Sequence, residues 1–146
     1  MTTQNKDIQL ASELRTVVTR LVKKLRKESV TGQQLSLTER SVIALLNREK
    51  TLLPSELASM EKITNQSMSQ ILNNLLGLGY ITKTPSETDK RKVLISLTGE
   101  GENMLLQIRH ERDEWLARAI SQKCTNEDEA LLGKAIGILT RLVDFE

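Results

Sequence analysis

The chain has 146 residues, of which 38% are hydrophobic, 27% are charged and only 2% are aromatic. This length fits a single domain with an aliphatic core, and one cysteine and one histidine exclude a disulfide framework, a cysteine metal cluster and most histidine-dependent catalysis. The net charge of +2 hides an asymmetry, because residues 1–92 carry 15 Lys/Arg against 9 Asp/Glu, whereas residues 93–146 carry 6 against 10. A basic first part favours a polyanionic partner.

No segment is apolar over the length of a membrane span, and the first ten residues lack the features of a signal peptide. A glycine-rich phosphate loop and a nucleophile–base pair are both missing from the sequence, which argues against an enzyme. We therefore expect a cytoplasmic protein that is not an enzyme and uses neither a metal nor a cofactor.

The chain begins with two predicted helices. Apolar residues recur at spacings of four, three and four along residues 7–28, as on one face of a helix. Residues 36–50 form the second helix, which starts either at a capping box of Ser36 and Glu39 or at Thr38. The sequence leaves these two starts open.

Two shorter helices follow. Residues 52–63 have Pro54 at the first helical position, where the missing N–H costs nothing. Thr64 caps the next helix, and Gly79 stands where a C-terminal glycine is expected. The apolar stripe of this fourth helix comprises Met68, Ile71, Leu72, Leu75 and Leu78.

The remaining elements are a hairpin and two helices. Residues 80–83 and 93–97 have strand-like composition, and the nine residues between them form an extended tip. A fifth helix is capped by Thr98 and ends near Gln122, and residues 125–145 form the last helix with its own apolar repeat.

This order of elements predicts a mainly α fold, a winged helix-turn-helix with a two-stranded β wing, flanked by N- and C-terminal dimerisation helices. We expect a single domain over residues 1–146, with a DNA-binding lobe at 36–99 and dimerisation helices at 7–28 and 100–145. Pairing with a second copy explains why apolar positions persist to the end of the chain.

The fourth helix is unusual because Thr64 to Tyr80 carries no charge at all. Solvated helix faces usually carry Lys and Glu, whereas amides offer a donor and an acceptor that match adenine N6 and N7. We therefore predict that this helix reads DNA bases, with its outward residues Thr64, Asn65, Gln66, Ser69, Gln70 and Asn73 at the interface.

The hairpin tip supplies the positive charge that this helix lacks. It contains Asp89, Lys90, Arg91 and Lys92, and a hairpin of this size reaches a minor groove, where the negative potential favours arginine. Asp89 is expected to hold the Arg91 guanidinium by a charge-assisted hydrogen bond. Alone, such a stretch is typical of a solvated turn. The DNA-binding interpretation of the hairpin tip therefore depends on the helices that precede it.

The run "LTERSVIALL…PSELASMEKITNQSMSQILNNLLGLGYITKTPSETDKRKVLISLTGEGE" resembles the MarR (multiple antibiotic resistance regulator) family. Its most specific parts are Leu-Gly-Tyr-Ile (78–81), Asp89-Lys90-Arg91 and Leu97-Thr98. The resemblance implies a dimeric transcriptional regulator whose fourth helix enters the major groove while Arg91 enters the minor groove. It also implies a small-molecule effector bound in a cleft between the DNA-binding lobe and the dimerisation helices.

Two residues depart from the pattern expected of the family. Lys62 stands where a helix-turn-helix often has glycine, so a left-handed backbone there would be modestly strained. The peroxide-sensing branch uses a cysteine near the N-terminus, whereas Cys124 lies late in this chain and is expected to be a structural thiol. Tyr80, Trp115 and His110 are conceivable pocket residues, but packing or surface roles are favoured.

The sequence thus predicts a regulator that binds double-stranded DNA at a palindromic operator as a homodimer, in the manner of a ligand-responsive repressor. The alternative is a winged-helix module that has lost DNA binding and binds a protein instead. An uncharged fourth helix and the missing glycine at position 62 support that alternative.

Overall fold

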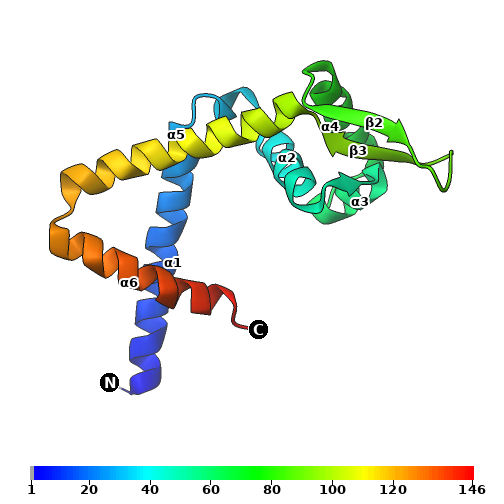
Figure 1. Ribbon diagram of the computed structural model, residues 1–146. Helices are drawn as coiled ribbons and strands as arrows, with labels where there is room; N and C mark the ends of the chain where they lie inside the picture. Colours follow the sequence, from blue (N-terminus) through cyan, green and yellow to red (C-terminus); the bar gives the residue numbers. More distant parts are fainter. Residues whose placement is uncertain (1) are drawn as a thin grey trace.

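The computed structural model describes residues 2–146, and most of them are helical (Figure 1). In chain order the elements are α1 (Thr3–Glu28), the 3-10 turn η1 (Gly32–Gln34), α2 (Leu37–Glu49), β1 (Thr51–Leu52), α3 (Pro54–Glu61), α4 (Asn65–Gly77), β2 (Ile81–Pro85), β3 (Val93–Leu97), α5 (Gly99–Lys123) and α6 (Asn126–Val143). Figure 1 shows α2, α3, α4 and the strands gathered at one end, hereafter the winged lobe (residues 36–98). Helices α1 and α5 lead away from this lobe, α6 turns back from the far end of α5, and both marked chain ends lie below the lobe in this view.

The predicted wing is present, and it belongs to a sheet with one more strand than the sequence indicated. Strands β2 and β3 pair antiparallel from Ile81 opposite Leu97 to Pro85 opposite Val93, and β1 pairs with the other edge of β3. Strand β1 has only two residues, too few for any alternation of apolar and polar positions to show in the sequence. Its pairing is fixed by packing against β3 instead.

The core is aliphatic, as the low aromatic content predicted. It lies in the winged lobe, and the first turns of α5 pack against it. Helix α5 therefore contributes to the core of the winged lobe and also extends beyond it. The buried apolar residues are Leu35, Val42, Ile43, Leu46, Leu52, Leu57, Ala58, Met68, Leu72, Leu75, Ile81, Ile95, Met104, Leu105 and Ile108.

The start of α2 is the capping box, which settles the two starts that the sequence left open. The Ser36 hydroxyl accepts the Glu39 N–H at 3.1 Å, and the Glu39 carboxylate accepts the Ser36 N–H at 2.9 Å. Helix α3 has no side-chain oxygen at its N-cap, because that residue is Leu53. The Glu56 carboxylate compensates by accepting the Leu53 N–H at 2.9 Å, which satisfies one free donor of the helix start.

The end of α4 is a Schellman motif around the predicted glycine. Gly79 has a φ of 83°, the Tyr80 N–H donates to Leu75 O at 3.1 Å, and the Gly79 N–H donates to Leu76 O at 3.1 Å. The expectation that Leu78 belongs to the apolar stripe is wrong, because Leu78 is the C-cap residue and is 46% exposed. The last helical turn ends before the stripe can include it.

Helices α1 and α6 leave their apolar residues exposed. None of the residues Thr3–Glu28 or Asn126–Val143 is buried. Exposed apolar residues on these helices and just after α6 include Ile8, Val17, Val18, Leu21, Val22, Leu131, Leu132, Ile136, Ile138, Leu139, Leu142, Val143 and Phe145.

Helix α1 begins at Thr3 rather than at residue 7, because the polar residues before Ile8 continue the helix although they lack the apolar repeat. Within residues 2–146, the helices are all too short or too polar to span a bilayer.

Candidate nucleic-acid interface

Helix α4 has one buried face and one exposed face, as its sequence predicts. Met68, Leu72 and Leu75 are buried in the lobe. The six residues predicted to face DNA are all exposed, namely Thr64, Asn65, Gln66, Ser69, Gln70 and Asn73. The exposed face therefore offers amides and hydroxyls without a formal charge, which suits hydrogen bonding to base edges.

The turn between α3 and α4 fixes how α4 crosses the lobe. Lys62 has φ 56° and ψ 43°, the left-handed conformation in which a side chain bears strain, so the conditional expectation for this residue is confirmed. The Ile63 N–H then donates to Ala58 O at 3.0 Å. Ala58 is only 2% exposed, and its small side chain fits beneath the turn.

Thr64 caps α4, as predicted. Its hydroxyl accepts the Ser67 N–H at 3.1 Å and lies 3.0 Å from the Ser67 hydroxyl. The hydroxyl of Thr64 is thus engaged at the helix start, which leaves the amides of Asn65, Gln66 and Gln70 to offer donors and acceptors on this face.

A cation that the sequence reading missed lies beside this neutral face. Lys83 Nζ of β2 donates to Asn73 Oδ1 of α4 at 3.2 Å, and both side chains are exposed. The bond joins α4 to the wing. Lys83 is an outward residue in an alternating strand, a position that sequence periodicity alone treats as ordinary solvent-facing surface.

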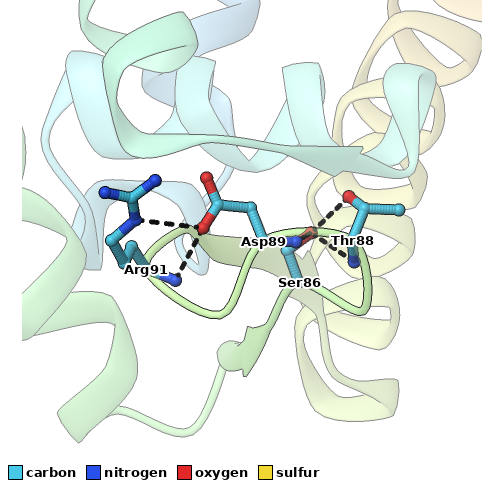
Figure 2. A network of polar contacts seen from close by, with 4 residues as sticks. All are labelled: Ser86, Thr88, Asp89 and Arg91. Carbon is cyan, nitrogen blue, oxygen red and sulfur yellow. Dashed lines mark hydrogen bonds and ion pairs between the residues drawn. The ribbon is translucent and has the colours of Figure 1, made fainter.

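The wing tip holds the predicted Asp89–Arg91 pair (Figure 2). Asp89 Oδ1 accepts the Arg91 backbone N–H at 3.1 Å and Arg91 Nε at 3.4 Å. Ser86 closes the other half of the tip, because its hydroxyl lies 3.1 Å from that of Thr88 and accepts the Thr88 N–H at 3.3 Å. The tip is thereby ordered by its own side chains, although Lys90, Arg91 and Lys92 are all exposed.

Arg91 is free to meet a partner. Its side chain is 93% exposed, whereas that of Asp89 is 34% exposed. An ion pair this exposed contributes little to folding, so its main effect is to restrict the directions in which the guanidinium points.

Three arginines converge where α1, α2 and α5 meet. Arg26, Arg40 and Arg112 line a cavity of about 240 Å3 together with Leu37, Ser41 and Ala44, so this lining includes no acidic residue. Arg40 Nε and Nη1, Arg112 Nε and Oε2 of the adjacent Glu111 are buried without a hydrogen-bond partner among residues 2–146. Burial, together with the charges of Arg40 and Arg26, lowers the pKa of Arg112. The sequence reading missed this cluster because its members are far apart along the chain.

A carboxylate on α5 fastens the segment between α1 and α2. Glu111 Oε1 accepts the Thr31 N–H at 2.9 Å and lies 3.4 Å from the Ser29 hydroxyl. The Thr31 N–H, with a smaller contribution from the hydroxyls of Thr31 and Ser29, holds the pKa of Glu111 below its ordinary value. This contact joins the entrance of the winged lobe to the long helix that leaves it.

The three aromatic or imidazole residues considered for a pocket lie apart from the arginine cavity. Tyr80 packs against the core, and His110 lies 3.2 Å from Glu114 on the surface of α5. Trp115 and the half-buried Cys124 line an apolar groove of about 480 Å3 between α5 and α6. Across residues 2–146, no group of three or more His, Cys, Asp or Glu side chains is arranged to hold a metal ion.

Comparison with known proteins matches this geometry to one family. The sequence profile of the MarR family matches residues 33–92, which include α2, α3, α4, β2 and the wing tip. The HTH-type transcriptional regulator MT0903.1 of Mycobacterium tuberculosis is 30% identical over 138 residues, which cover 94% of this chain and 95% of that protein.

Solved structures share the whole fold. A transcriptional regulator from Pseudomonas aeruginosa PA01 is 33% identical, with a TM-score of 0.81 over 97% of this chain and 99% of the other. A MarR variant from E. coli in complex with operator DNA shares the fold at 19% identity, with a TM-score of 0.58 over 95% and 99% of the two chains. The chain therefore belongs to the MarR family of winged helix-turn-helix transcriptional regulators, which are not enzymes.

Proposed function

We propose that this chain is a ligand-responsive repressor that binds a palindromic operator as a homodimer. The observation that carries the proposal is the uncharged, amide-rich face of α4 with cations on either side of it. Lys62 precedes the helix, Lys83 lies beside it, and the wing adds Lys90, Arg91 and Lys92. Cations bind phosphates whatever the sequence, whereas neutral amides discriminate between bases.

In this proposal α4 lies in the major groove. Asn65, Gln66, Ser69, Gln70 and Asn73 face the base edges, and Thr64 fixes the start of the helix. The wing follows the DNA backbone and inserts Arg91 into the adjacent minor groove, with its guanidinium directed by Asp89.

The homodimer is proposed from the unburied apolar faces of α1 and α6. A single chain leaves Leu132, Ile136 and Leu139 exposed beside the groove that α5 and α6 form. Exposed apolar surface of this extent marks an interface, and a second copy supplies the same kind of surface. A twofold dimer presents two α4 helices about 34 Å apart, one turn of DNA, and therefore prefers a palindrome.

The ligand response is proposed from the arginine cavity. Buried guanidinium N–H groups without partners are costly, so an anion of suitable size is stabilised there. The cavity lies between α2 of the winged lobe and helices α1 and α5, so an occupant can favour one spacing of the two α4 helices over another. We propose a small organic carboxylate as the effector class.

Selection of genomic fragments that bind the purified protein tests the proposal. We expect enrichment of a palindromic sequence near the gene of the protein itself, with affinity that falls steeply as salt rises. Gln70→Ala is expected to change the selected bases, because Gln70 is proposed to contact them. A protein partner captured in stoichiometric amount, with no salt-dependent binding to any duplex, would instead favour the protein-interaction module.

The dimer and the effector site have separate tests. Ile136→Glu should yield monomers in light scattering and weaken operator binding, whereas Val30→Glu, at a residue 73% exposed outside α1 and α6, should leave the dimer intact. Arg112→Met should remove the release of operator by a phenolic carboxylate probe. The matched control is Arg118→Met, because Arg118 is also on α5 but does not line the arginine cavity.

A further inference from the structure

Helix α4 is joined to α2 by one polar side-chain contact that neither core packing nor the DNA-facing residues explain. Asn74 Nδ2 donates a hydrogen bond to Glu39 Oε2, between residues 35 apart in sequence. Asn74 lies one position after Asn73, the last residue of the proposed DNA face, and Glu39 lies in the first turn of α2.

The carboxylate of Glu39 is itself held in place. Its second oxygen accepts the Ser36 N–H at 2.9 Å, and the Glu39 N–H donates to the Ser36 hydroxyl at 3.1 Å. Glu39 is only 9% exposed. A carboxylate with one oxygen fixed by a helix cap and the other aimed at Asn74 forms a rigid attachment point for α4.

Asn73 and Asn74 therefore tie the same turn of α4 to two different elements. Asn73 bonds Lys83 of the wing at 3.2 Å, and Asn74 bonds Glu39 of α2. The buried side chains of Met68, Leu72 and Leu75 set which face of the helix is turned inward, and hydrogen bonds at its edges can restrict the smaller rotations that remain. Hydrogen bonds do have direction, so the two asparagines constrain how α4 is turned about its axis.

We infer that Glu39 and Asn74 are positioning residues that set the orientation of α4 for reading base edges. The inference rests on the proposed contact of α4 with DNA. Base discrimination needs amides placed to within about 0.5 Å, so a small rotation of α4 reduces binding to the operator more than binding to unrelated DNA, where phosphate contacts dominate. Neither residue needs to touch the DNA for this effect.

Exchanging the two groups tests the inference, because the exchange keeps the net charge of the wild type. The single variant Asn74→Asp places a second carboxylate against Glu39, and the repulsion should turn α4 away from its native orientation. The double variant Glu39→Gln with Asn74→Asp restores a donor opposite an acceptor with their positions exchanged. Glutamine also serves in a capping box, so the start of α2 is kept.

The readout is the ratio of affinities for the selected operator and for an unrelated duplex, measured at several salt concentrations. We expect Asn74→Asp to lower this ratio roughly tenfold and the double variant to restore it to within about threefold of the wild type. Repulsion between the introduced carboxylate and phosphate acts on both duplexes and in both variants, so it cancels in these comparisons.

Two results would overturn the inference. One is a ratio that stays at the wild-type value in Asn74→Asp while only the unfolding midpoint falls, since that describes a residue needed for stability alone. The other is a double variant whose ratio remains as low as that of Asn74→Asp although it is folded by circular dichroism. A wild-type protein without sequence preference would contradict the proposed function instead, and an effect of Gln70→Ala without one of Asn74→Asp would contradict only this inference.

Discussion

Lys83 Nζ lies 3.2 Å from Asn73 Oδ1, so the wing strand β2 and helix α4 meet through a hydrogen bond between a cation and an amide. This contact brings a positive charge to the edge of a helix that has none. The neutral surface of α4 is thus bordered by charges from other elements, and in the proposed function those charges attract the DNA while α4 reads its bases.

Replacement of Lys83 by methionine should weaken binding to every duplex through the lost charge, and binding to the operator somewhat more, because the bond to Asn73 is also lost. The variant keeps the apolar length of the side chain but removes the charge and the bond to Asn73. If Lys83 neutralises one phosphate, the slope of log K against log salt should fall in magnitude by about 0.9. Arg48→Met is the control, because Arg48 is paired with Glu49 at 3.0 Å and its loss should leave the slope nearly unchanged.

For the Asp89–Arg91 pair at the wing tip, charge and geometry predict opposite effects of a substitution at Asp89 on DNA binding. Arg91→Ala should weaken operator binding roughly tenfold with no change in thermal stability, because the side chain is 93% exposed. Asp89→Asn removes a negative charge near DNA, so simple electrostatics would strengthen binding. We expect it to weaken binding, since the guanidinium loses the carboxylate that directs it. Tighter binding by Asp89→Asn in anisotropy titrations would contradict this role.

Gly101 should be indispensable where α5 begins. A Cβ there would lie 2.2 Å from the Tyr80 carbonyl oxygen, and the Thr98 N–H donates to that same oxygen at 3.0 Å. Gly101→Ala should therefore lower the free energy of unfolding by about 1–3 kcal/mol or more, as overpacking does. Gly99 is the matched control, since a Cβ at that position meets nothing within 4 Å. Urea unfolding that shows equal stability for the two alanine variants would contradict this packing.

Lys62 stores strain that glycine should release. Its φ of 56° and ψ of 43° disfavour a side chain, although glycine costs conformational entropy in the unfolded chain. We expect Lys62→Gly to raise the free energy of unfolding by about 0.5 kcal/mol, with an unchanged m-value, at fixed protein concentration. A loss of stability would show that the Lys62 side chain contributes more than its backbone strain costs.

Glu111 should make stability depend on pH in the acidic range. Its pKa in the folded protein is lowered, chiefly by the Thr31 N–H, so its stabilising effect is present above the pKa of the unfolded state and is lost as pH falls through the folded pKa. The difference in unfolding free energy between the wild type and Glu111→Gln should be constant near neutral pH and shrink below about pH 4.5, the ordinary value. A difference that stays constant into acid would contradict this contact.

Local signals in the sequence predicted much of the fold. The Ser, Thr and Pro residues at helix starts, Gly79 at the end of α4 and the apolar stripe of Met68, Leu72 and Leu75 each act within a few residues of one another. Strand β1 escaped prediction because it is two residues long and depends on β3.

The contacts that were missed join residues distant in sequence. Asn73 and Asn74 are adjacent and chemically identical, yet their partners are a lysine 10 residues away and a glutamate 35 residues away. The arginines of the cavity come from three helices. Only the packing of those helices brings such groups together, so no periodicity along the chain reveals them.

The central claim is that two copies of α4 read DNA bases while the wings hold the flanking backbone. Sequencing of genomic fragments selected by the purified wild-type protein tests this most directly. The account predicts a twofold-symmetric motif whose half-sites are centred about 10 base pairs apart, one helical turn. Selected fragments with no shared motif, or with a single unpaired half-site, would contradict it.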